Sequence, residues 1–118
     1  MSLDCSRLGL DAAMSREFPA GYPFARAFRG EEWRQITGSF GMEASRGAAL
    51  LWSAKEAAAK MAGCGFHLFE PRDVSVTVLG KDEYAWRSEV SLPPTGETSP
   101  VRAYSFEQNW GWISLALQ

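Results

Sequence analysis

The chain has few of the residues that build disulfide-rich, metal-clustered or membrane-spanning proteins. Its 118 residues include two cysteines, Cys5 and Cys64, and one histidine, His67. Two cysteines cannot form a disulfide framework or supply the four ligands of a structural zinc site. No apolar run approaches the ~20 residues of a transmembrane helix, and the N-terminal residues lack the basic-then-apolar pattern of a signal segment. We therefore expect a reduced, cytoplasmic protein with no membrane association.

The chain also has no large excess of positive or negative charge. The formal net charge is −2, which gives no general attraction to nucleic acid or to an anionic membrane. Hydrophobic residues make up 46% and charged residues 22%, the composition of an ordinary globular protein. We interpret residues 1–118 as one domain. A domain of this size buries a small core, so self-association would not be surprising.

The pattern of the chain changes from helical to extended near its middle. Apolar periodicity predicts a short strand from Arg7 to Asp11 that ends in a carboxylate, and two short helices, Phe24–Arg29 and Glu31–Thr37. A long Ala-rich helix follows from Glu43 to Ala62, stopped by the glycines after it. The remaining residues alternate with period two and predict two strand pairs, one turning at 80–82 and one around Asn109. Helices followed by an antiparallel sheet indicate an α+β fold, with one long helix packed on a small sheet.

The long helix has two different faces. At about 100° per residue, one face carries only apolar residues and is expected to be core, namely Leu50, Leu51, Ala54, Ala57, Ala58 and Met61. The other face carries Trp52, Lys55, Glu56, Ala59 and Lys60. Glu56 and Lys60 are an i,i+4 pair that stabilises a helix by a few tenths of a kcal/mol. Periodicity alone therefore favours a solvated face over a binding site.

Two motifs at a fixed separation give this face a second interpretation. The segment Trp52–Lys60 (WSAKEAAAK) resembles the signature helix of the 4′-phosphopantetheinyl transferase superfamily, W-[ST]-x-K-E-[AS]-x-x-K. The segment Leu8–Asp11 (LGLD) resembles the companion motif [IV]-G-[IV]-D, and Asp11 precedes Trp52 by 41 positions. Residues 26–33, 71–76 and 110–117 are similar to further segments of the family. The resemblance thus spans most of the chain and implies the α+β fold of these transferases.

The resemblance implies a reaction and a cation. Members of this superfamily transfer the phosphopantetheine arm of coenzyme A to a serine of an apo acyl or peptidyl carrier protein and release 3′,5′-ADP. By resemblance, Asp11 and Glu56 are the carboxylates that hold Mg²⁺, a cation that takes one or two carboxylates together with phosphate oxygens and water. Taken alone, Asp11 has the simpler interpretation of a turn or cap residue. The family pattern often continues D-x-E, but this chain has Ala13 at that place, and we expect water there instead.

The resemblance also assigns contacts to the substrate. Lys55 and Lys60 correspond to phosphate contacts, and Lys60 and Glu56 to catalytic groups, although an exposed helix position is the ordinary fate of a lysine. Arg26 and Gly65 are placed among the coenzyme A contacts. Glu32 matches an acid that some members are thought to use as general base, with a metal-bound water as the competing base.

The remaining alternatives concern partners and activity. Nine of the twelve basic residues are arginines; those near residue 30 either steer an acidic carrier protein or form an ordinary solvated face. Short members of the family are trimers with shared pockets, so we expect a homo-oligomer, with a trimer favoured over a dimer. A non-catalytic relative that binds carrier protein or coenzyme A is the second hypothesis, supported by Ala13. The sequence leaves open whether the carrier serves fatty acid biosynthesis or another pathway.

Overall fold

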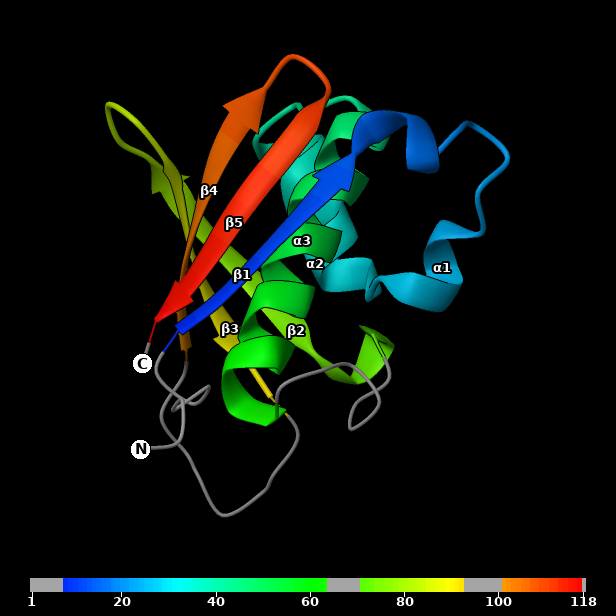
Figure 1. The fold of residues 1–118 in the computed structure, drawn as a ribbon. Helices are drawn as coiled ribbons and strands as arrows, with labels where there is room; N and C mark the ends of the chain where they lie inside the picture. Colours follow the sequence, from blue (N-terminus) through cyan, green and yellow to red (C-terminus); the bar gives the residue numbers. More distant parts are fainter. Residues whose placement is uncertain (1–7, 64–70, 93–100, 118) are drawn as a thin grey trace, which may run out of the picture.

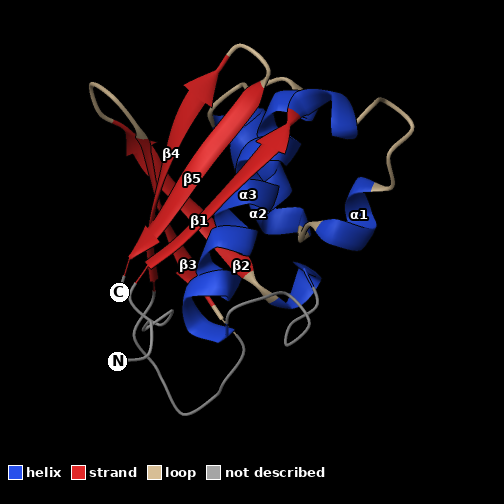
Figure 2. Ribbon diagram, in the orientation of Figure 1, coloured by secondary structure: helices blue, strands red, loops and turns tan. Residues whose placement is uncertain are grey.

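Helices cover one face of a five-stranded antiparallel sheet. The computed structural model describes residues 8–63, 71–92 and 101–117. The strand order is β1-β5-β4-β3-β2, so β1 and β2 are the two edge strands. Figures 1 and 2 show the helices gathered behind the sheet. This arrangement confirms the expected α+β class. The strands are β1 (Leu8–Met14), β2 (Ser75–Lys81), β3 (Trp86–Ser91), β4 (Val101–Gln108) and β5 (Gly111–Leu117).

Helix α3 (Ala44–Gly63) is the centre of the fold. Alanine and leucine favour a helix because they lose little side-chain freedom in it. The face expected to be core is at most 1% exposed and packs on the sheet, as predicted. It meets inward-facing strand residues such as Val76, Val90, Ala103 and Trp112, each at most 2% exposed. None of the helices in the described part of the chain has both the length and the hydropathy that crossing a membrane requires.

The strand pairings agree with the predicted hairpins, with one local difference. β2 pairs with β3, and β4 pairs with β5, both antiparallel. The predicted turn at 80–82 extends further, because Tyr84 is 79% exposed and precedes β3. The turn is organised by Asp82, whose Oδ1 accepts hydrogen bonds from the backbone N–H groups of Tyr84 and Ala85. A carboxylate that caps its own turn in this way takes residues 82–85 out of the ladder.

Strand β1 continues past the predicted end at Asp11. It pairs with β5 from Leu8 opposite Leu117 to Met14 opposite Gly111. Asp11 therefore lies in the middle of the strand, opposite Ser114, and the prediction of a strand-end carboxylate is wrong. The ladder on both sides of Asp11 fixes the position of its backbone.

The segment between β1 and α3 is built from short helices and aromatic contacts. α1 (Phe24–Ala27) and α2 (Gly30–Arg34) lie where two helices were expected, but both end earlier. Residues Gln35–Ser39 form a π-helical turn in place of the end of the second predicted helix. The Trp33 ring stacks on Phe24, with a centroid distance of 4.7 Å, and on Phe28, at 5.5 Å. This aromatic packing anchors α1 and α2 against the domain.

Gly9 sets the distance between β1 and α3. A Cβ atom at this position would lie 1.8 Å from the Ala57 carbonyl oxygen and 2.8 Å from the Met61 backbone nitrogen. Backbone atoms cannot move aside as a flexible side chain can. Only glycine permits this close approach, which explains the glycine in the Leu8–Asp11 motif.

We expect Gly9→Ala to lower the free energy of unfolding. The loss should exceed the cost of extra methylene groups in a packed core, which is typically about 1–3 kcal/mol. The added methyl group forces β1 away from α3. Urea unfolding of Gly9→Ala and of Gly21→Ala measures the effect, because a Cβ at Gly21 meets nothing within 4 Å. Equal midpoints for the two variants would contradict the close approach.

Candidate active site

Asp11, Glu56 and Lys60 meet where β1 crosses α3. The Lys60 Nζ donates a hydrogen bond to Asp11 Oδ1 at 2.5 Å and lies 3.5 Å from the Leu10 carbonyl oxygen. The Asp11 side chain is 10% exposed and the Lys60 side chain 45%. The bond to Asp11 raises the pKa of Lys60. Lys60 thus pairs across to the strand and not simply with Glu56 along its own helix, as the i,i+4 spacing had suggested.

The carboxyl groups of Asp11 and Glu56 form a carboxylate pair. Burial and then the negative charge of Asp11 raise the pKa of Glu56, which also makes a side-chain contact with Asp11. A hydrogen bond from the side chain of Trp52 and the charge of Lys60 act in the opposite direction. The second oxygen of Asp11, Oδ2, is buried and has no hydrogen-bond partner among the residues that the structure describes. Two adjacent acids with an unsatisfied oxygen form a site that favours a cation.

The carboxylate pair fits a hard divalent cation. Mg²⁺ prefers oxygen ligands and commonly takes one or two carboxylates, completing its shell with phosphate oxygens and water. Asp11 Oδ2 is an oxygen without a partner, and Glu56 supplies a second carboxylate beside it. Among the described residues, no group of three or more His, Cys, Asp or Glu side chains gathers to hold a metal. The two carboxylates could therefore hold such a cation, with phosphate oxygens or water as its further ligands.

Ala13 follows Asp11 by two positions in β1. It is 1% exposed and belongs to the hydrophobic core. Residues 11 and 13 share a face of β1, but the register with β5 sets Ala13 opposite the buried Trp112. The position at which many family members have a third acid is thus occupied by a buried core methyl group.

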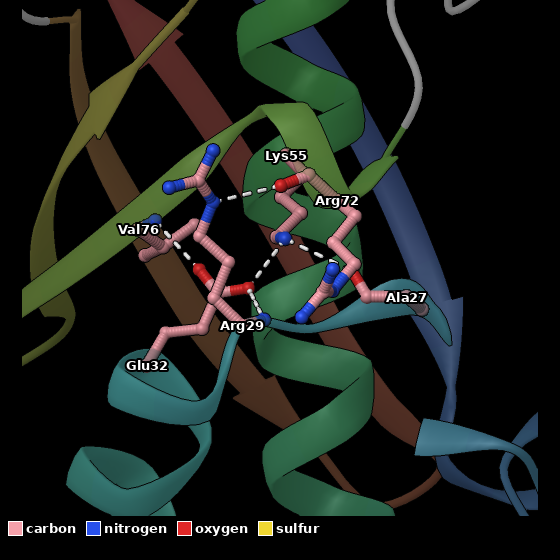
Figure 3. A network of polar contacts seen from close by, with 6 residues as sticks. All are labelled: Ala27, Arg29, Glu32, Lys55, Arg72 and Val76. Atoms are coloured by element: carbon pink, nitrogen blue, oxygen red, sulfur yellow. Dashed lines mark hydrogen bonds and ion pairs between the residues drawn. The ribbon is translucent and has the colours of Figure 1, made fainter. Parts of the chain in front are cut away.

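A second polar cluster, the buried network, lies against β2 (Figure 3). Glu32 of α2 is 3% exposed, and its Oε1 accepts hydrogen bonds from Lys55 Nζ at 2.5 Å and from the Arg29 backbone nitrogen at 2.8 Å. Its Oε2 accepts a hydrogen bond from the Val76 backbone nitrogen at 2.8 Å. Lys55 Nζ also donates to the Ala27 carbonyl oxygen at 3.1 Å. One lysine and one glutamate thereby tie α3, the α1–α2 segment and an edge strand together.

Lys55 does not occupy the exposed position expected of a phosphate contact. Its side chain is fully buried, and burial lowers its pKa although the charge of Glu32 acts in the opposite direction. Ala59, expected on the same solvated face, is also buried. The prediction of a solvated second face is therefore wrong at these two positions, and Lys55 is covered where it contacts Ala27 of α1 and Glu32 of α2. Trp52, Glu56 and Lys60 remain partly or largely exposed.

The two clusters lie against opposite edges of the sheet. Asp11 belongs to β1, whereas Glu32 bonds to β2, and the strand order puts these strands at the two edges. Glu32 is the acid that the resemblance suggests as general base, with a metal-bound water as the alternative. Both of its oxygens accept hydrogen bonds in the interior, from Lys55 and from the backbone of Arg29 and Val76.

The free edge of β2 is covered by side chains of α2 and of the turn that follows it, a contact that was not predicted from the sequence. Gln35 Oε1 accepts a hydrogen bond from the Val78 backbone nitrogen at 2.9 Å, and Gln35 Nε2 donates to the Val78 carbonyl oxygen at 2.8 Å. Together with the bond from Val76 to Glu32, these contacts substitute for a missing neighbouring strand. An exposed edge invites pairing with other chains, so this cover protects the sheet. The i,i+3 spacing of Glu32 and Gln35 was the one available signal.

The remaining predicted contacts to coenzyme A are Arg26 and Gly65. Arg26 is exposed on α1, and Gly65 lies outside the described residues, as do Cys5, Cys64 and His67. Arg29 Nε donates to the Arg72 carbonyl oxygen at 2.8 Å. Two open grooves of about 340 and 360 Å³ flank Arg29 and Glu31, and Arg26 lines neither of them. The described geometry therefore brings Arg29 to a concave surface.

Ser53 is buried in the core. Its Oγ lies 2.6 Å from Ser114 Oγ, which in turn lies 2.7 Å from Ser105 Oγ. Ser53 Oγ also donates to the Leu50 carbonyl oxygen at 3.1 Å. This row of hydroxyls links α3 to the two central strands beside Asp11.

The fold and the carboxylate pair agree with the family comparison. Residues 7–109 match the 4′-phosphopantetheinyl transferase superfamily. This match covers most of the chain, and the chain belongs to that superfamily. A search of curated proteins finds no match. Membership supports phosphopantetheinyl transferase-type chemistry and leaves the substrate, the cation and the residue roles to be proposed.

Proposed function

We propose that the protein transfers the 4′-phosphopantetheine group of coenzyme A to a serine of an apo acyl or peptidyl carrier protein and releases 3′,5′-ADP in a Mg²⁺-dependent reaction. The observation that carries this proposal is the carboxylate pair of Asp11 and Glu56, with Lys60 beside it and Asp11 Oδ2 left without a partner. This arrangement occurs in a chain of the superfamily, at the two motifs that resemble those of the family.

The reaction requires neutralisation of negative charge. The serine oxygen forms a bond to a phosphorus of the pyrophosphate, the phosphorus–oxygen bond to 3′,5′-ADP breaks, and the hydroxyl proton is lost. Such reactions are catalysed mainly by positioning and by charge stabilisation. A divalent cation held by Asp11 and Glu56 would neutralise the pyrophosphate. Lys60, with a 45% exposed side chain at the same place, would contact a phosphate oxygen.

For the proton of the attacking hydroxyl, we favour solvent at the carboxylate pair over Glu32. Both oxygens of Glu32 accept hydrogen bonds in the interior, and its ion pair with Lys55 would have to open before it could take a proton. We propose that Glu32 and Lys55 position α3, on which Glu56 lies, without contacting the substrate.

The decisive experiment mixes the protein with coenzyme A, Mg²⁺ and a panel of apo carrier proteins and follows the carrier mass by mass spectrometry. Addition of one phosphopantetheine group to at least one carrier supports the proposal, and loss of the addition when Mg²⁺ is chelated supports the cation. The alternative of a non-catalytic relative predicts binding of a carrier or of coenzyme A with no mass change. That result across carriers of fatty acid, polyketide and peptide type would replace the proposal.

We further propose that the protein self-associates through the outer face of the sheet. On the face turned away from α3, leucines of β1 and β5 lie side by side in register, Leu8 opposite Leu117 and Leu10 opposite Leu115. Leu8 is 53%, Leu10 58% and Leu117 36% exposed. A contiguous exposed apolar patch on a small domain is typical of an interaction surface. A second copy of the chain is the proposed occupant, as the resemblance to short, oligomeric family members implies.

Sedimentation velocity tests this surface. We expect an oligomer for the parental protein and a monomer for Leu10→Lys, because a charge in the middle of the patch cannot be desolvated without a partner. Leu79→Lys is the matched control, since Leu79 is 51% exposed on the opposite edge strand β2. A parental protein that sediments as a monomer, or a Leu10→Lys variant that remains oligomeric, would refute the assignment of this face.

A further inference from the structure

Lys60 is the basic residue that reaches the carboxylate pair. Its Nζ lies 2.5 Å from Asp11 Oδ1 and 3.5 Å from the Leu10 carbonyl oxygen, and its charge acts on Glu56 as well. The other carboxylate oxygen of Asp11, Oδ2, receives no hydrogen bond from the described residues. The ammonium group therefore neutralises one side of the pair and leaves the other side unsatisfied.

Two neighbouring carboxylates repel one another, and the repulsion is greater where water is partly excluded. The Asp11 side chain is 10% exposed, so solvent screens its charge poorly. A monovalent ammonium group compensates one of the two negative charges. A divalent cation held by Asp11 Oδ2 and Glu56 would compensate both, and its charge would repel the ammonium group on Asp11 Oδ1.

We infer that Lys60 is a resident counter-ion of the carboxylate pair, which a divalent cation must displace. The inference rests on the proposed function for its assignment of Asp11 and Glu56 as cation ligands. Lys60 keeps the two acids together while no cation is bound. Displacement then frees an ammonium group, attached to a side chain that is already 45% exposed, to contact the anionic substrate arriving with the cation. Binding of the cation and availability of Lys60 are thus coupled.

This coupling predicts that removing Lys60 strengthens cation binding. Lys60→Met keeps the aliphatic stem and deletes the competing charge, so we expect the Kd for Mn²⁺, measured by titration calorimetry without coenzyme A, to fall about tenfold. Without a cation, Lys60→Met should melt at a lower temperature than the parental protein, and added Mn²⁺ should raise its melting temperature by more. Lys60→Arg retains the charge and should bind Mn²⁺ as the parental protein does.

The matched control is Lys81→Met, which removes the same charge from an exposed position at the end of β2. If Lys60→Met binds Mn²⁺ no more tightly than Lys81→Met, the counter-ion assignment is overturned. Asp11→Asn and Glu56→Gln separate this failure from failure of the cation site. Unchanged Mn²⁺ binding in both of these variants would show that the cation lies elsewhere, whatever Lys60→Met does. Absence of Mn²⁺ binding in both the parental protein and Lys60→Met would overturn both assignments.

Discussion

Glu56→Gln is expected to lower the rate of phosphopantetheine transfer by about a thousandfold, the loss seen when one preorganised electrostatic group is removed from an active site. Gln has nearly the same shape but cannot supply an anionic ligand for a cation. The stability of the fold should not suffer. Burial and the charge of Asp11 raise the pKa of Glu56, which means that the folded protein disfavours the ionised side chain, and a neutral amide removes this repulsion.

The measurement pairs a transfer assay with thermal unfolding. Lost transfer with an unchanged or raised melting temperature is the expected result for Glu56→Gln. Glu83→Gln makes the same chemical change at an exposed position in the β2–β3 turn and should retain parental activity. Transfer by Glu56→Gln at the parental rate would remove Glu56 from the site. A large fall in stability would instead assign Glu56 a structural role.

The fold was predictable where local pattern and packing agree. The six apolar positions of the long helix are buried as their spacing requires, and alternating residues in the second half form the two expected hairpins. The predictions failed where a contact between distant residues determines the local structure. β1 continues past Asp11 because β5 offers partners up to Gly111. A π-helical turn follows α2, and it starts at Gln35, whose side chain bonds to the edge of β2.

The candidate site was likewise predictable only in part. The two motifs indicated Asp11 and Glu56, and the structure brings both side chains together, because Gly9 lets β1 approach α3 closely. The same motif also suggested that Lys55 contacts a phosphate of the substrate. Spacing along a helix cannot reveal that residues of α1 and α2 cover Lys55. The burial of Lys55 and the engagement of Glu32 depend on contacts between residues 23 positions apart, for which the helical pattern contains no signal.

Lys55→Met is expected to lower the free energy of unfolding by about 3 kcal/mol, because it leaves Glu32 as a buried charge without its partner. In a domain of this size, the melting temperature should fall by on the order of 10 °C. Lys81→Met removes an exposed lysine and should change stability by less than about 0.5 kcal/mol.

A double-mutant cycle separates the ion pair from other effects of the substitution. Glu32→Gln removes the negative charge but keeps one oxygen for the backbone N–H groups of Arg29 and Val76. The combination with Lys55→Met should therefore cost at least about 1 kcal/mol less than the sum of the two single variants, as expected for residues in one network. If Lys55→Met unfolds like Lys81→Met yet transfers no phosphopantetheine, Lys55 contacts the substrate, as the resemblance implies. Since its ammonium group is already bonded to Glu32 and Ala27 in the interior, loss of stability is the expected outcome.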